Sequence, residues 1–140
     1  MMEQLHNFLA TYRDTSFETG VNDCALFVAA WIKLCTGQDL AAHFHGRYCN
    51  DAGSHRLIRK QGFKHLKEMV HSLGDDIGER LDNPLLAQRG DVVWLNDTRH
   101  CLCGIVCSSG IAVLSDSGLS ILPLHTAITA WRIPISGEVL

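Results

Sequence analysis

The first half of the chain carries hydrophobic residues at helical spacing. One stripe predicts a helix over residues 2–13, and it consists of Leu5, Phe8, Leu9 and Tyr12. The segment from Asp23 to Cys35 is apolar nearly all round, which predicts a helix buried in the core. Gly37 follows this segment in a position suited to a C-cap. Two more polar helices are expected, one from Ser54 up to Gly62 and one over residues 63–73.

The pattern changes after Pro84 and Gly90 to short apolar runs separated by turn residues, which are typical of β-strands. The predicted strands cover residues 92–95, 101–107, 111–114, 119–122 and 130–133, with a short turn or helix near residues 123–128. Helices followed by a meander of strands predict an α+β domain, in which N-terminal helices pack on a C-terminal antiparallel sheet.

Length and charge narrow the possible functions. A chain of 140 residues fits a single domain, 1–140, with its own core. The net charge of −3 gives no electrostatic footprint for nucleic acid. The N-terminus lacks the features of a signal peptide, and no apolar run reaches the roughly 18 residues needed to span a membrane. We therefore expect synthesis in a cytoplasm, with the six cysteines reduced.

Cys24 is the strongest candidate for chemistry. It follows a turn-forming glycine and the polar pair Asn22-Asp23, at the start of the most apolar predicted helix. A thiol at a helix N-terminus feels the positive end of the dipole, so we expect a lowered pKa and a nucleophilic thiolate. The alternative is that Cys24 is a small hydrophobic residue of a buried helix.

Three further cysteines, Cys101, Cys103 and Cys107, lie close together near His100. Their spacing does not match a standard zinc site, and the chain has no Cys-x-x-Cys pair. On a strand these residues share one face, so packing explains them at least as well. We expect neither a metal nor a cofactor, and a thiol-based redox or metal protein is the weakest of the functional hypotheses.

The order of these motifs resembles that of the NlpC-type cysteine peptidases, which belong to the papain-like superfamily. In that family an Asp-Cys pair opens a core helix, and an Arg-Gly-Asp segment followed by two hydrophobic residues begins a strand. Asp23-Cys24 and the segment 89–93 match these two motifs. The resemblance implies the papain-like fold and a thiol nucleophile at Cys24, with backbone N–H groups at the helix start binding the oxyanion.

The chain resembles even more closely a set of small phage and prophage proteins related to that family. The resemblance covers most of residues 10–133 and rests on the shared order of several short segments. Besides the Asn-Asp-Cys helix, these are Thr36-Gly37-Gln38-Asp39, Gly46-Arg47-Tyr48, Gly90-Asp91, Ser117-Gly118-Leu119 and Ala130-Trp131-Arg132.

One departure from the family pattern affects the catalytic assignment. The position of the general-base histidine matches Leu102, and a leucine cannot accept the thiol proton. His100 lies two residues earlier, on the same face of a regular strand but roughly 6.5–7 Å further along. A β-bulge or a shifted register could bring His100 to Cys24. Ser115 or Asp116 could then orient the base after a further small shift. The alternative, which the sequence favours somewhat, is that His100 is a solvent-exposed residue of the loop formed by residues 96–99.

Two functions follow from the resemblance. One is a cysteine peptidase or amidase that cleaves peptidoglycan peptides, with Cys24, His100 and Ser115 as the catalytic set and Asn22 and Asp23 as oxyanion or capping residues. Asp23 is expected to cap the helix or fix the loop rather than carry a proton. The other is a catalytically degenerate scaffold that binds phage tail proteins. Both imply a protein made in the bacterial cytoplasm, with the virion tail as a destination, and the oligomeric state stays open.

Overall fold

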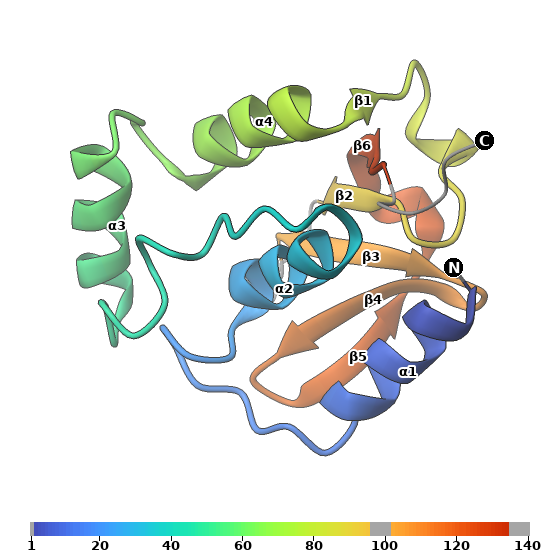
Figure 1. The fold of residues 1–140 in the computed structure, drawn as a ribbon, viewed down its shortest axis with the longest axis horizontal. Coiled ribbons are helices and arrows are strands. Elements are labelled where there is room, and N and C mark those ends of the chain that lie inside the picture. Colours follow the sequence, from blue (N-terminus) through green and yellow to red (C-terminus); the bar gives the residue numbers. More distant parts are fainter. Residues whose placement is uncertain (1, 96–101, 135–140) are drawn as a thin grey trace.

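A computed structural model describes residues 2–95 and 102–134, and Figure 1 shows their arrangement. Within these described residues, four α-helices precede a six-stranded antiparallel sheet, so the predicted α+β class is confirmed. The helices are α1 (Met2–Tyr12), α2 (Cys24–Thr36), α3 (Asp51–Lys60) and α4 (Leu66–Ile77). The strands are β1 (Glu79–Arg80), β2 (Val92–Leu95), β3 (Cys103–Cys107), β4 (Gly110–Ser115), β5 (Gly118–Leu122) and β6 (Ala127–Arg132). Two short 3-10 helices, η1 (Pro84–Leu86) and η2 (Leu124–Thr126), lie in the connections.

Capping residues set the helix ends. Gly37 ends α2 in the left-handed conformation, with φ of 82° and its N–H bonded to the Lys33 carbonyl, as predicted. The predicted starts of α3 and α4 are wrong by about three residues. The side chain of Asn50 accepts a hydrogen bond from the Gly53 N–H and starts α3 before Ser54. The ring of His65 does the same for the Glu68 N–H, so α4 begins at Leu66.

The sheet has the strand order β1-β6-β2-β3-β4-β5. Strands β2 to β5 form the predicted meander, and β6 returns to pair with β2 on the other side. Val92 is the central position, opposite Ile105 of β3 and Trp131 of β6. This pairing places the last strand, β6, beside β2, and leaves β1 and β5 as the edges of the sheet.

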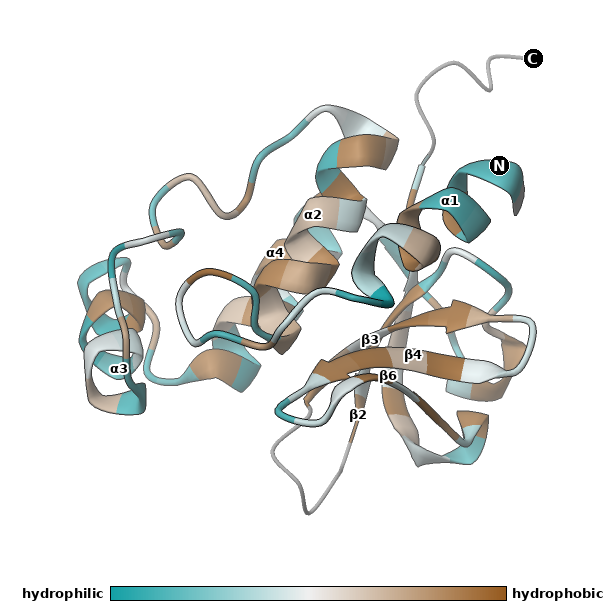
Figure 2. Cartoon of the chain, turned by 90° about the horizontal axis from the view of Figure 1, so that it is seen from below, coloured by the Kyte–Doolittle hydropathy of each residue, from teal (hydrophilic) through white to brown (hydrophobic). Residues whose placement is uncertain are grey.

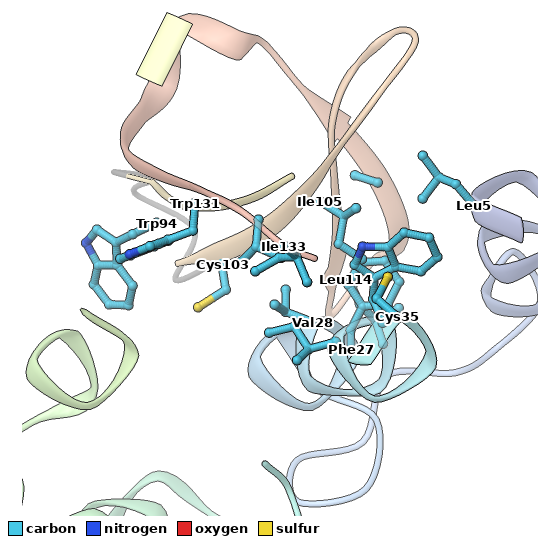
Figure 3. Packing of buried hydrophobic residues seen from close by; sticks show 14 residues of the cluster. Leu5, Phe27, Val28, Cys35, Trp94, Cys103, Ile105, Leu114, Trp131 and Ile133 are labelled. Atoms are coloured by element: carbon cyan, nitrogen blue, oxygen red, sulfur yellow. The ribbon is translucent and has the colours of Figure 1, made fainter. Parts of the chain in front are cut away.

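Both faces of the sheet are buried. Alternate residues of each strand point to one face, so Ile105 of β3 and Leu114 of β4 join the core beneath α2. The intervening residues, such as Val106 and Val113, form a second cluster on the opposite face. Figure 3 shows Cys103 and Ile133 of the strand region opposite Val28 of α2. The larger core therefore fixes α2 against β3 and β4.

A buried hydrogen bond ties α2 to the start of β2. The indole N–H of Trp31 donates to the carbonyl oxygen of Gly90 at 2.9 Å. Next to it the carboxylate of Asp91 accepts from the Gln88 N–H at 2.8 Å and from Arg132 at 3.2 Å. The Arg-Gly-Asp segment that carried part of the resemblance thus has a structural use in this chain, since Gly90 and Asp91 hold the helix, a turn and β6 together.

The remaining helices lie around this centre (Figure 1). Phe8 of α1 packs its ring 5.5 Å from that of Phe27 and 5.4 Å from that of Trp31. On the other side α4 contacts β1, and the indole N–H of Trp131 donates to Asp75 of α4 at 2.9 Å. Figure 2 shows hydrophobic segments on α2, α4 and the strands. Within the described residues, no helix combines the length and apolar character needed to cross a membrane.

Candidate functional site

Cys24 is the first residue of α2, and Asp23 is its N-cap residue. The carboxylate of Asp23 is buried and accepts three hydrogen bonds. The Leu26 N–H donates to Oδ1 at 3.0 Å, the Gly20 N–H donates to Oδ2 at 3.0 Å, and the hydroxyl of Tyr48 also donates to Oδ2. Asp23 therefore fixes both the helix start and the loop before it, and both of its carboxylate oxygens are used as hydrogen-bond acceptors.

Tyr48 closes this arrangement from the connection between α2 and α3. Burial and then the hydrogen bond to Asp23 raise the pKa of Tyr48 above its usual value of 10.0, so the hydroxyl keeps its proton and donates. Gly20 allows the close approach: its φ is 85°, and a Cβ there would overlap the carbonyl oxygen of Tyr48. The carbonyl of Gly20 in turn accepts from the Gly46 N–H at 2.7 Å.

The thiol of Cys24 does not have the lowered pKa predicted from its position at a helix end. Burial raises the pKa above the usual value of 9.0 and is the largest effect. Backbone hydrogen bonds from Leu102, Cys103 and Ala25 act in the opposite direction, while the negative charge of Asp23 adds to the rise. Desolvation outweighs the helix end here, because the sulfur lies between α2 and the start of β3. At neutral pH the thiol is protonated.

The strand residues beside the sulfur are Leu102 and Cys103. Leu102 is the residue that the resemblance matches to the general-base position. His100, the proposed base, lies outside the described residues, as does Cys101. None of the described residues that line the cavity around Cys24 is a histidine. His71 of α4 is engaged elsewhere: its Nδ1 bonds to the Lys67 carbonyl at 2.8 Å and its Nε2 to the Thr129 hydroxyl at 2.9 Å.

Cys24 opens onto a cavity of about 520 Å³ between α2, α3, α4 and the sheet. Asp23, Tyr48, Ser115 and Asp116 line the same cavity. The Ser115 hydroxyl closes the turn between β4 and β5, donating to the Gly118 carbonyl at 3.1 Å and accepting from the Ser117 N–H at 3.2 Å. Of the residues predicted from sequence, the structure therefore brings Cys24, Asp23 and Ser115 to one cavity.

Asn22 does not line the cavity. Its backbone forms a bridge with Glu18, in which the Asn22 N–H donates to the Glu18 carbonyl at 2.8 Å and the Glu18 N–H donates back at 2.9 Å. Asn22 thus shapes the turn that delivers Asp23 to the helix start.

The structure offers no support for metal ligation by the cysteines that it describes. Across residues 2–95 and 102–134, no group of three or more His, Cys, Asp or Glu residues is placed to hold a metal ion. Cys103 is buried in the core and lines the cavity next to Cys24, and burial raises its pKa well above 9.0. It behaves as a packing residue, which is the alternative that the strand pattern left open.

Tyr48 is the site residue that sequence reasoning did not single out. It lies 25 residues from Asp23, and no periodicity links the two. The one signal was its place in the Gly46-Arg47-Tyr48 segment of the resemblance, where it was a marker of likeness rather than a member of the site.

The sequence matches a known protein family. Residues 1–133 match the sequence model of a family described as "Domain of unknown function (DUF6950)". A search among curated proteins found no match. Since the match covers nearly the whole chain, the chain belongs to that family.

Proposed function

We propose that this member of the DUF6950 family is a cysteine hydrolase with a papain-like, NlpC-type fold, and that Cys24 is its nucleophile. The observation that carries the proposal is the position of the thiol. Cys24 stands at the first residue of a core helix, on the wall of a cavity, with backbone amides of the strand region directed at its sulfur. A helix start combined with convergent amides is an arrangement suited to stabilising negative charge.

The raised pKa of Cys24 determines which mechanism is compatible with the site. Because the thiol is protonated at neutral pH, attack requires a general base that removes the proton as the bond forms, rather than a preformed thiolate. In the proposal His100 is that base and Ser115 is the residue that orients it. Sγ attacks the carbonyl carbon, amides at the start of α2 stabilise the oxyanion, and the leaving group departs with the proton. Water then hydrolyses the thioester.

The resemblance to the NlpC-type peptidases suggests a peptidoglycan peptide as the substrate. The resemblance to the phage and prophage proteins suggests that the enzyme acts for a phage or prophage. In that setting the enzyme would open the bacterial cell wall locally. Asp23 and Asn22 are positioning residues in this mechanism, since their contacts hold the loop and helix start around Cys24.

The test measures hydrolysis of amide, ester and thioester substrates, including peptidoglycan stem peptides. The Cys24→Ser variant should lose activity to background, and His100→Ala should lower kcat. Cys49→Ser is the control, because it removes an exposed thiol that does not line the cavity, and it should keep activity. Activity that survives Cys24→Ser would exclude Cys24 as the nucleophile.

A second candidate, a non-catalytic scaffold that binds phage tail proteins, is favoured by a specific observation. Burial keeps the Cys24 thiol protonated, and the residue beside it just before β3 is Leu102, whose side chain has no proton acceptor. Alkylation with iodoacetamide separates the two candidates, with Cys49, which is exposed, replaced by serine to remove background. A rate near neutral pH that falls in His100→Ala supports the hydrolase. A rate that rises only above pH 9, and is equal in both proteins, supports the scaffold.

A further inference from the structure

The cavity beside Cys24 is mainly apolar. Four residues of α2, namely Ala25, Val28, Ala29 and Ile32, line it at the i, i+3, i+4 and i+7 positions of one helical face. Hydrophobic side chains of α4 and of the connection between α2 and α3 form the other walls, including Phe44, Met69 and Leu73. The volume of about 520 Å³ lies within the range of about 300–1,000 Å³ that is typical of ligand pockets.

One wall of the cavity runs along α2. Cys24, Val28 and Ile32 follow one another at intervals of four residues, so the lining extends along the helix for about 12 Å at 1.5 Å per residue. The thiol stands at one end of this row. A straight apolar group attached to a carbonyl at Cys24 would therefore lie along Val28 and Ile32.

Charge restricts the occupant further. The ionisable residues that line the cavity, apart from the two cysteines and Tyr48, are Asp23, Asp51 and Asp116. No lysine, arginine or histidine is among the described lining residues. A carboxylate or phosphate would meet the negative charge of these three aspartates, with no cation among the described lining residues to compensate it. A neutral chain meets no such penalty.

We infer that the cavity binds an unbranched aliphatic chain, and that the substrate of Cys24 is a neutral acyl ester, thioester or amide carrying that chain. The substrate class rests on the proposed function, whereas binding of the chain does not. In the reaction the Sγ–C bond forms, the bond from the carbonyl carbon to the leaving group breaks, and the leaving group takes the thiol proton. Water then cleaves the thioester to a carboxylic acid and restores the thiol. The product acid gains a negative charge on ionising, which favours its release past the acidic residues.

The binding test uses the Cys24→Ser protein, so that no chemistry is required. N-phenyl-1-naphthylamine, a neutral apolar fluorophore, should bind saturably and be displaced by methyl decanoate. Ala29→Phe places a ring in the cavity and should weaken binding at least about tenfold. Ala30→Phe is the matched control, since Ala30 neighbours Ala29 on the same helix but does not line the cavity, and it should bind within about twofold of the parent.

The kinetic test uses wild-type protein and p-nitrophenyl esters with acetyl, butyryl, octanoyl and dodecanoyl groups. From acetyl to octanoyl, kcat/KM should rise by about threefold to fourfold per methylene buried. Saturable binding without turnover of any ester would refute the hydrolase and leave the chain-binding cavity supported. Three results would overturn the inference. The first is equal turnover of the acetyl and octanoyl esters, and the second is the absence of saturable binding of the fluorophore. The third is equal binding by the Ala29→Phe and Ala30→Phe variants.

Discussion

The contact between Asp23 and Tyr48 allows a quantitative test of how the start of α2 is held. Replacing Asp23 by alanine removes the N-cap, which typically costs about 1 kcal/mol. It also leaves the N–H of Gly20, a buried residue, and the hydroxyl of Tyr48 without their acceptor. A buried donor that loses its partner costs about 1–3 kcal/mol. Because Tyr48 is only half-buried and water can reach its hydroxyl, we expect a total loss of about 3 kcal/mol in the free energy of unfolding for Asp23→Ala.

Tyr48→Phe removes the hydroxyl alone. In this variant the carboxylate of Asp23 still accepts hydrogen bonds from the Gly20 and Leu26 amides. A hydrogen bond to a charged group contributes about 1.5–3 kcal/mol, and partial replacement by water reduces the expected loss to about 1–2 kcal/mol. If the two side chains act through each other, the double variant should lose less than the sum, with a coupling energy of about 1 kcal/mol.

Urea unfolding of the four proteins measures the cycle, and Asp14→Ala is the control for removing an exposed aspartate. The control should stay within about 0.5 kcal/mol of wild type. A coupling energy below about 0.3 kcal/mol would refute the reasoning, because the hydroxyl and the carboxylate would then contribute independently.

Three further predictions concern the core and the thiol. Gly104→Ala should destabilise the fold by about 1–3 kcal/mol, because a Cβ there would overlap the side chain of Ile111; an unchanged urea midpoint would contradict this. Trp31→Phe should lower the melting temperature by removing the donor to the Gly90 carbonyl, and wild-type stability in that variant would mean the bond is dispensable. Since burial raises the pKa of Cys24 above 9.0, the folded protein binds more protons than the unfolded chain above that pH. The free energy of unfolding should then fall as pH rises above 9, and fall less in Cys24→Ser; equal slopes would exclude the thiol as a cause.

Local patterns predicted the helices and the meander because each of these depends on residues close in sequence. The segment from Asp23 to Cys35 is apolar on nearly all sides, so a helix there can bury its surface only in the core. Gly37 then adopts the left-handed conformation that ends the helix. The start of α3 was misplaced because Asn50 caps a helix whose first turn is polar, where the hydrophobic pattern gives no signal. The start of α4 was placed too early because the hydrophobic residue Phe63 precedes the His65 cap and extends the apolar pattern beyond the helix.

Strand pairing across long distances was not predictable in the same way. The return of β6 to β2 depends on Trp131 packing opposite Val92, and that contact joins residues from the two ends of the strand region. The two-residue strand β1 forms only because β6 offers it an edge. In the site, the Asn-Asp-Cys motif pointed to a capped helix start. Tyr48 reaches Asp23 through the tertiary fold, so its part in the site required the structure.

Burial of the Cys24 sulfur has opposite consequences for reactivity and for recognition. The apolar surroundings that raise the pKa of the thiol also line the cavity for which we infer a preference for an uncharged chain. A substrate that fills the cavity expels water and strengthens every remaining electrostatic interaction, including those of the amides at the sulfur and of any base that approaches it. Catalysis in such a site requires that the thiol lose its proton after the substrate has bound, because the free protein does not hold a thiolate. The decisive side chain for activity is therefore the proton acceptor, because Cys24 and its cavity are equally compatible with a hydrolase and with a non-catalytic scaffold.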